Sequence, residues 1–221
     1  MTLDVEERAR QSLGISEQAI YEMAARALAA RDIRGALVLD VGCGVGSLRP
    51  FVRERFARYV GVDVVRYEGF PAEGEFCQVD LDTGRAELPE GCADAVLAIE
   101  TIEHLENPRA FLRELVRLAK PHGWVFVTTP NLLSLLSLIT LAGKQRFAGF
   151  QDCDYPAHIS PVLEIDLRRI AAECGLQDVA IEYSLNGRVI FTDWHYPRGL
   201  AKIAPRWCSD NLLLAGRKAA I

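Results

Sequence analysis

One short segment of this 221-residue chain places three side chains capable of acid–base or metal chemistry at the spacing Glu-x-x-Glu-His. They are Glu100, Glu103 and His104, and another histidine, His158, follows later in the chain. If the segment turns helically, the three side chains of the motif share one face. Mixed carboxylate and imidazole ligands suit a divalent metal such as Mg, Mn or Zn at a catalytic site. These four residues are therefore candidate metal ligands.

The same residues also fit a site without metal. Glu103 and His104 can cap a helix or line a pocket, and His158 can be a hydrogen-bonded structural histidine in a loop. Because imidazole titrates near neutral pH, His104 or His158 is then the best candidate for a general base. Under both alternatives Glu103, His104 and His158 are the candidate catalytic residues.

A glycine-rich turn earlier in the chain indicates where a cofactor binds. The apolar run 36–41 stops in the sequence Gly-Cys-Gly-Val-Gly, and Asp63 ends the next apolar run. The glycines of this turn are Gly42, Gly44 and Gly46. A strand, a Gly-x-Gly-x-Gly turn and a later acid form a nucleotide-cofactor pocket of the Rossmann type, in which glycine lets the backbone approach the ligand. Asp63 is then placed to accept hydrogen bonds from ribose hydroxyls.

Acidic residues around this turn favour one class of cofactor. Asp40 lies two residues before the first glycine, where an acid suits a cationic ligand better than the pyrophosphate of a dinucleotide. S-Adenosylmethionine (SAM) carries a sulfonium and an α-amino group and no phosphate. After the third apolar run, Asp80 is expected to accept from the adenine amino group and Leu81 to pack beside the ring. With Glu100 these residues complete the expected SAM pocket, and an NAD-dependent oxidoreductase is the Rossmann alternative.

Strands and helices alternate along the chain, which predicts one α/β domain over residues 1–221. The expected strands are 36–41, 59–63, 76–79, 95–99, 124–128, 179–183 and 212–216, and the expected helices between them are 47–58, 107–118 and 165–174. This order predicts a Rossmann-like, mostly parallel sheet with helices on both faces. Residues 1–31 form an N-terminal helical segment, and residues 131–160 a cap insertion over the substrate after the fifth strand.

The motifs between residues 35 and 131 resemble those of class I SAM-dependent methyltransferases. The resemblance rests on the glycine turn, on residues 100–104 and on the sequence Thr-Thr-Pro-Asn at 128–131, and it continues more weakly through residues 158–161. The branch with these motifs includes ubiquinone-biosynthesis O-methyltransferases and many small-molecule and sugar methyltransferases. The resemblance implies SAM-dependent O-methylation of a small hydroxylated metabolite, a sugar or a lipid-linked precursor.

Other functions fit the same motifs. Small-RNA 2′-O-methyltransferases use a Glu-x-x-Glu-His pattern with a distant histidine to hold a divalent metal beside the target hydroxyl, and some enzymes of the ubiquinone branch are also metal-assisted. The resemblance therefore implies SAM and, as an open alternative, Mg or Mn. The formal net charge of −5 argues against nucleic acid as the main partner. A non-catalytic SAM-binding partner protein is the third alternative, against which the intact motif argues weakly.

The rest of the sequence bears on location and on the acceptor. None of the six cysteines is spaced as C-x-x-C, which argues against structural zinc and favours a reduced, cytoplasmic protein. The apolar run 132–143 is shorter than the roughly 20 residues of a spanning helix, so no transmembrane segment is expected. Its composition favours an apolar acceptor. Residues 194–196, Trp-His-Tyr, lie in the C-terminal connection, where packing is favoured over lining a substrate cleft.

Overall fold

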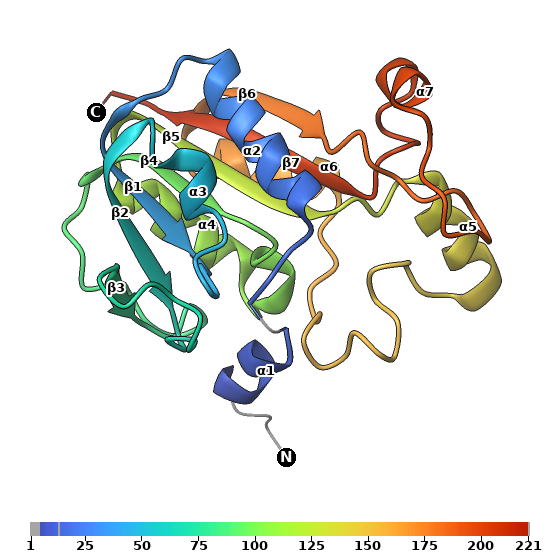
Figure 1. Ribbon diagram of the computed structural model, residues 1–221, viewed down its shortest axis with the longest axis horizontal. Coiled ribbons are helices and arrows are strands. Elements are labelled where there is room, and N and C mark those ends of the chain that lie inside the picture. Colours follow the sequence, from blue (N-terminus) through green and yellow to red (C-terminus); the bar gives the residue numbers. More distant parts are fainter. Residues whose placement is uncertain (1–4, 13, 221) are drawn as a thin grey trace.

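The computed structural model describes residues 5–12 and 14–220, and a single sheet is its central element (Figure 1). Its strand order is β3-β2-β1-β4-β5-β7-β6. The strands are β1 Gly35–Val41, β2 Phe56–Asp63, β3 Glu75–Gln78, β4 Ala93–Ala98, β5 Ala119–Pro130, β6 Leu176–Tyr183 and β7 Asn211–Lys218. Strands β1 to β5 pair in parallel, whereas β7 is antiparallel to both β5 and β6. The expected Rossmann-like, mostly parallel α/β fold is confirmed.

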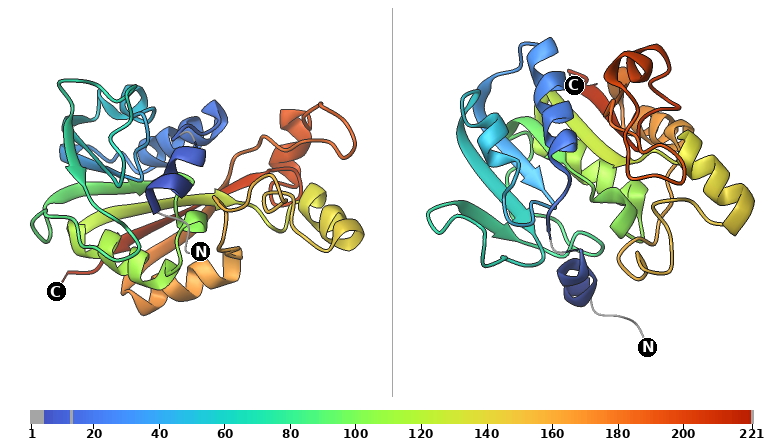
Figure 2. Two further views of the ribbon diagram at one scale, coloured as in Figure 1. Left: turned by 90° about the horizontal axis from the view of Figure 1, so that it is seen from below. Right: turned by 45° about the vertical axis from the view of Figure 1, so that its right-hand side comes forward.

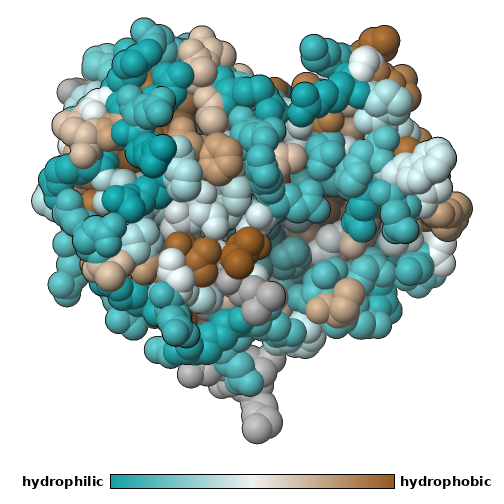
Figure 3. Space-filling view, in the orientation of Figure 1, coloured by the Kyte–Doolittle hydropathy of each residue, from teal (hydrophilic) through white to brown (hydrophobic). Residues whose placement is uncertain are grey.

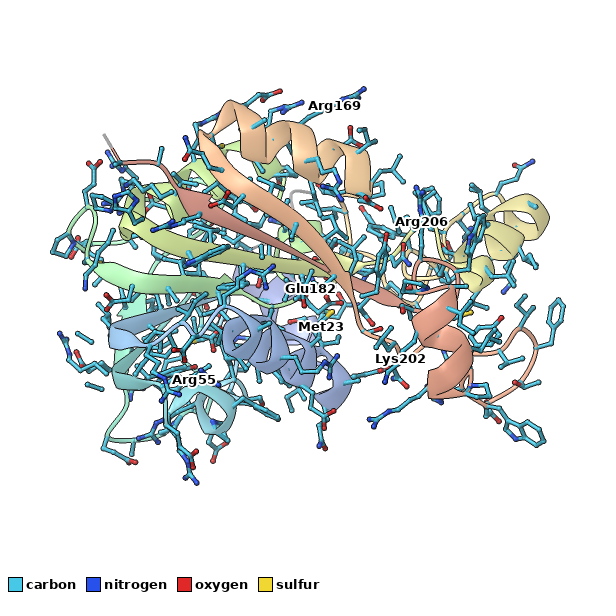
Figure 4. All side chains as sticks on the ribbon, turned by 90° about the horizontal axis from the view of Figure 1, so that it is seen from above. Met23, Arg55, Arg169, Glu182, Lys202 and Arg206 are labelled. Carbon is cyan, nitrogen blue, oxygen red and sulfur yellow. The ribbon has the colours of Figure 1, made fainter. Side chains whose placement is uncertain are left out.

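Helices cover both faces of the sheet, as the two views of Figure 2 and the nearly edge-on view of Figure 4 show. One face carries α2 (Gln18–Ala30) and α3 (Arg49–Val52), and the other carries α4 (Pro108–Leu118) and α6 (Glu164–Glu173). The shorter elements are α1 Val5–Gln11, the 3-10 helix η1 Ile102–His104, α5 Leu135–Lys144 and α7 Arg198–Ile203.

Strand β1 shows why the fold has a core on each face. Leu37, Leu39 and Val41 pack in the cluster that contains α4 and α6, whereas Val38 packs in the cluster that contains α2. Successive side chains of a strand point to opposite faces, so a central parallel strand must be apolar at nearly every position. Asp40 is the polar exception in this strand. A carboxylate at a buried position of a central strand indicates a functional constraint rather than a packing one.

The helix after the glycine turn is shorter than the sequence predicts. The expected helix over residues 47–58 is reduced to α3, and β2 begins at Phe56 rather than at residue 59. Phe56 is buried and pairs with Gly35 at the start of the parallel β1–β2 ladder. The burial of Phe56 and its ladder hydrogen bonds outweigh the helical pattern of the preceding residues, so the helix prediction is wrong for residues 53–58.

The segment expected to form the cap, residues 131–160, begins where β5 ends and leads to α6. Asn131 is the first residue of this segment. Its Nδ2 group donates to the carbonyl oxygens of Arg206 and Ser209, each at 2.8 Å. The cap is thereby attached to the connection that precedes β7. Within the described ranges, no helix is long and apolar enough to cross a membrane. All six cysteines are free thiols.

Candidate active site

The glycine turn brings the backbone of two segments into direct contact. The Gly42 amide donates to the Val62 carbonyl oxygen at 2.7 Å, which joins the end of β1 to the end of β2. Gly44 has a φ of +51°, and a Cβ atom there would lie 2.0 Å from the carbonyl oxygen of Gly14. Only glycine allows this close approach. The turn therefore keeps its shape because the N-terminal segment is packed directly on it.

Two buried aspartates flank the turn. The Asp63 carboxylate accepts hydrogen bonds from the Gly44 amide at 2.9 Å and from the Val64 amide at 2.7 Å. Asp40 accepts a hydrogen bond from the Tyr59 hydroxyl at 2.5 Å. The pKa of Asp40 is raised to about 7, mainly by burial, with the Tyr59 hydrogen bond opposing the shift and the charge of Asp63 adding to it. Two carboxylates held together in a buried place favour a cationic ligand.

A cavity of about 440 Å³ runs from this turn to the cap. Of the residues that the sequence assigns to a cofactor or to catalysis, those lining it are Asp40, Gly42, Asp63, Leu81, Glu100, His104 and His158. Gly44, Gly46 and Glu103 do not line it, and the two glycines shape the turn through their positive φ angles. The cap contributes part of the wall, including Leu132, Leu136 and Ala148, which gives the far end of the cavity an apolar side.

Asp80 is not in the position expected for adenine recognition. It does not line the cavity, and its two carboxylate oxygens accept from the Asp82 amide at 2.9 Å and from the Thr83 hydroxyl at 2.7 Å. Asp80 therefore stabilises the turn after β3, a role that aspartate often takes in loops. The wall of the cavity at this point is formed by Leu81 and Asp82. The expected role of Asp80 toward adenine gains no support from this geometry.

Glu103, His104 and His158 lie together at the end of β4. One potential ligand atom from each falls within 4.8 Å of the other two. The two imidazole rings pack edge to face, with their centroids 4.7 Å apart. Glu103 is fully buried, and neither of its carboxylate oxygens accepts a hydrogen bond of normal geometry. Burial raises the pKa of Glu103 well above its usual value, and the neighbouring Glu100 raises it further.

Hydrogen bonds to carbonyl groups orient both histidines. The Nδ1 atom of His104 lies 2.9 Å from the Ala157 oxygen, and the Nδ1 atom of His158 lies 2.5 Å from the Gly149 oxygen. A carbonyl oxygen only accepts, so this contact assigns the proton of a neutral ring to Nδ1 and leaves its Nε2 with a lone pair. The pKa of His104 is lowered to about 4, mainly by burial and in part by the nearby His158. The neutral His104 ring thus offers a lone pair for a metal or a proton.

The backbone beside these residues explains how the distant His158 reaches His104. The Glu103 carbonyl oxygen accepts hydrogen bonds from the Ile159 amide at 3.0 Å and from the Ser160 amide at 2.9 Å. The Ser160 hydroxyl donates to the Leu105 carbonyl oxygen at 2.5 Å. These three bonds fasten the end of the cap to η1. The sequence predicted both parts of the cluster, and this attachment joins them.

Glu100 belongs to a different part of the cavity wall. Its carboxylate accepts from the Asn211 amide group at 2.7 Å, and it lies outside the three-residue cluster. Glu100 has a φ of +47°, a backbone conformation that is rare outside glycine and that costs free energy. Burial raises its pKa to about 7, while hydrogen bonds from Thr128 and Asn211 oppose the shift. Its expected role as a fourth metal ligand gains no support from this geometry.

Three residues of the site have no place in the sequence prediction. Arg8 of α1 forms a buried ion pair with Asp82 at 2.6 Å, and both residues line the cavity. No local pattern indicates this contact, because the residues are 74 positions apart. The sequence does contain a signal for Asn211, because it is the polar residue with which the last apolar strand begins. That strand runs antiparallel to β5 and therefore begins at the edge where the cavity lies.

Comparison with known proteins identifies this arrangement. The sequence family described as "Methyltransferase domain" matches residues 15–181. The chain belongs to the class I SAM-dependent methyltransferases. The ubiquinone biosynthesis O-methyltransferase of Chromobacterium violaceum is 33% identical over 155 residues, which are 65% of this chain and 66% of that protein. The enzyme of the same name from Xanthomonas oryzae pv. oryzae is 32% identical over 168 residues, which are 67% and 66% of the two chains.

Other relatives carry the same name, and solved structures share the fold. The chain spans about half the length of the ubiquinone biosynthesis O-methyltransferases of Paracidovorax citrulli and Leptothrix cholodnii, with 53% and 51% of their length matched. A SAM-dependent methyltransferase from Archaeoglobus fulgidus superposes with a TM-score of 0.60 at 20% identity, over 97% of this methyltransferase and 100% of that chain.

A second solved structure is that of the Burkholderia thailandensis 1,6-didemethyltoxoflavin-N1-methyltransferase with bound 1,6-didemethyltoxoflavin and S-adenosylhomocysteine. It superposes with a TM-score of 0.61 at 17% identity, over 92% and 80% of the two chains. At such identities the likeness of both solved structures concerns the fold. The enzyme class therefore rests on the matched family and the curated relatives.

Proposed function

We propose that this methyltransferase methylates a hydroxyl oxygen of a small acceptor with the help of a divalent cation held by Glu103, His104 and His158. The observation that carries the proposal is the Glu103 carboxylate, which is fully buried and accepts no hydrogen bond of normal geometry. A buried carboxyl without a partner stays protonated, because its ionised form costs on the order of several kcal/mol unless a cation binds it. Two imidazole Nε2 atoms beside it complete a mixed carboxylate and imidazole donor set, which suits Mn better than Mg because Mg prefers oxygen ligands.

The orientation of the two histidine rings also suits a divalent cation. Both histidines keep Nδ1 on a carbonyl oxygen, so each ring is fixed before a ligand arrives. When bound, a divalent cation would lower the pKa of an acceptor hydroxyl and so supply a better nucleophile at neutral pH. The fixed rings and the buried Glu103 limit where that hydroxyl can lie relative to the methyl donor.

The residues around the glycine turn are proposed to hold SAM. Asp40 faces the cavity and would attract the cationic amino and sulfonium end of SAM. Asp63 has an oxygen lone pair left beside each backbone hydrogen bond, which would accept from the ribose hydroxyls. Leu81 offers an apolar contact for the adenine ring. This placement directs the methyl group toward the histidine end of the cavity.

Methyl transfer is an in-line displacement, and alignment is the main task of the protein. The acceptor oxygen forms a bond to the methyl carbon while the carbon–sulfur bond breaks and its electron pair returns to sulfur, which leaves neutral S-adenosylhomocysteine. The acceptor proton passes to water or to a nearby base. The cavity wall at the cap includes Leu132 and Leu136 as well as Arg188 and Asp210, which suits an acceptor with an apolar body and a polar end.

We also propose a cytoplasmic location for this enzyme, since its six cysteines are free thiols.

The buried Asp40 predicts that SAM affinity depends on pH. The Asp40 pKa of about 7 means that the carboxyl is largely protonated below that pH in the free protein and must lose its proton to attract a cation. From about pH 8 to about pH 6, SAM affinity should fall about tenfold. Calorimetric titration with SAM across this range measures the change. An Asp40→Asn variant should bind weakly with a flat profile, and an unchanged pH slope in that variant would contradict the role of Asp40.

Labelled methyl transfer tests the proposed function. The protein is incubated with radiolabelled SAM and a panel of catechol, phenol, sugar and amine acceptors, first with a chelator and then with added Mg or Mn. We expect label on hydroxyl acceptors only, restored by the metals after chelation. Labelling of amines alone, or full activity with chelator, would contradict the proposal. Preferential labelling of a short RNA in the same panel would reassign the acceptor class.

A further inference from the structure

The connection between β6 and β7 exposes five large apolar side chains at one end of the molecule. They are Phe191 (94% exposed), Ile203 (83%), Trp194 (78%), Trp207 (50%) and Leu200 (45%), and we call them the aromatic surface. This connection extends beyond the sheet and carries α7 (Figure 1), and brown side chains appear there at the upper right of Figure 3. The expected packing of residues 194–196 is therefore wrong for Trp194, which faces solvent.

Hydrogen bonds fix the turn of residues 189–194, which carries Phe191 and Trp194. The Val189 amide donates to the Trp194 carbonyl oxygen at 2.7 Å, and the Trp194 amide donates to the Thr192 hydroxyl at 3.2 Å. Phe191, at the tip of the turn, has a φ of +60°, which is rare for an aromatic residue. On the other side, the fully buried Ala201 anchors α7. An ordered display of aromatic groups to water is the mark of a binding surface rather than of a loose loop.

The charges around the aromatic surface are mostly positive. Between residues 188 and 207 the chain has Arg188, Arg198, Lys202 and Arg206 against the single acid Asp193, although the whole chain has a net charge of −5. Figure 4 shows Lys202 and Arg206 at this end of the molecule. Arg188 pairs with Asp210 at 3.3 Å and Arg206 with Glu164 at 3.9 Å, whereas in the described part of the chain neither Arg198 nor Lys202 has an ion-pair partner. Arg198 and Lys202 are therefore free to meet an anionic partner.

The surface also adjoins the cavity. Arg188 lines the cavity wall, and the turn that carries Phe191 begins at the next residue. Helix α5 contributes Leu136 and Ser137 to the same wall. A partner that covers the aromatic surface would thus lie beside the cap end of the active site.

We propose that the aromatic surface docks this enzyme on an anionic lipid bilayer. Tryptophan and phenylalanine side chains favour the interface between headgroups and acyl chains, and flanking Lys and Arg residues add attraction to anionic lipids. A second copy of the chain fits less well, because a symmetric contact through this surface would bring two sets of cations together. The proposal does not depend on the identity of the methyl acceptor.

Vesicle binding tests the docking. The full chain is sedimented with vesicles of phosphatidylcholine alone and with vesicles that contain about 30% phosphatidylglycerol. We expect binding at least about tenfold stronger to the anionic vesicles. Acyl chains labelled with bromine should quench part of the tryptophan fluorescence, and this part should be lost in a Trp194→Ser/Trp207→Ser variant.

Matched variants separate the apolar and the charged contributions. Phe191→Ser/Trp194→Ser should weaken binding to both vesicles at least about tenfold, while the same change at Ile165, an exposed side chain of α6, should not. Arg198→Glu/Lys202→Glu should remove the preference for anionic vesicles and leave S-adenosylhomocysteine binding intact, which verifies folding. The proposal would be overturned if the wild-type protein bound neither kind of vesicle, or if the variants bound as strongly as wild type. So would light scattering that shows a dimer dissociated by Phe191→Ser/Trp194→Ser.

Discussion

The Glu103→Gln variant is expected to transfer methyl groups at least about 100-fold more slowly than wild type while it binds S-adenosylhomocysteine normally. Glutamine preserves the volume of this fully buried side chain, but an amide is a much weaker ligand for a divalent cation than a carboxylate. The carboxylate accepts no hydrogen bond of normal geometry, so the change to an amide breaks no such hydrogen bond. Initial rates at saturating SAM, measured beside calorimetric binding of S-adenosylhomocysteine, check both halves of the prediction.

A matched substitution controls for the loss of one acidic side chain. Glu87→Gln makes the same chemical change at an exposed loop position and should leave the rate within about twofold. If Glu103→Gln also keeps a rate close to wild type, the buried carboxylate has no part in the reaction. Glu103 would then be an unusual structural residue.

The second large effect is expected for Gly44→Ala. The new Cβ atom would meet the Gly14 carbonyl oxygen at 2.0 Å, and the φ of +51° is strained for alanine even where space exists. The N-terminal segment must move away from the turn, and the hydrogen bond from the Gly44 amide to Asp63 is distorted. A loss of about 2 kcal/mol would weaken S-adenosylhomocysteine binding about 30-fold. The melting temperature of the free protein should fall by roughly 3–8 °C.

Gly143→Ala is the natural control for this substitution. Gly143 lies in α5, and a Cβ atom there would have no neighbour within 4 Å. Alanine in a helix is preferred over glycine, so stability should stay the same or rise by about 0.5–1 kcal/mol, with unchanged ligand binding. Wild-type ligand affinity in Gly44→Ala would show that the close packing of the N-terminal segment on the turn does not shape the cofactor site.

The sequence predicted those parts of the site that follow from strand ends. Asp40, Asp63 and His104 all come at or just after the carboxyl ends of parallel strands, and such ends share one edge of the sheet. Their common place in the cavity therefore follows from the strand pattern alone. The same logic put Asp80 beside the adenine ring, whereas its carboxylate oxygens accept hydrogen bonds within its own loop and Asp80 does not line the cavity.

Contacts between distant segments were beyond prediction from the sequence. The ion pair of Arg8 with Asp82 depends on where α1 lies over the cavity, and no local pattern encodes that position. The hydrogen bond from Asn211 to Glu100 depends on the antiparallel return of β7, which places Asn211 beside a strand end far away in the chain. The hydrogen bond from Asn211 holds the Glu100 carboxylate outside the cluster of Glu103, His104 and His158, although the sequence spacing groups Glu100 with Glu103 and His104.

Calorimetric titration of Mg and Mn into the S-adenosylhomocysteine-bound protein tests the central claim most directly. The account predicts saturable binding of one ion, lost in Glu103→Gln and in His158→Ala, because both residues belong to the three-residue cluster. The same titration of a Glu100→Gln variant should still show the ion, since Glu100 lies outside the cluster. Absence of saturable binding in the wild-type protein would contradict the metal site, and His104 or His158 would then be the base of a metal-free methyl transfer.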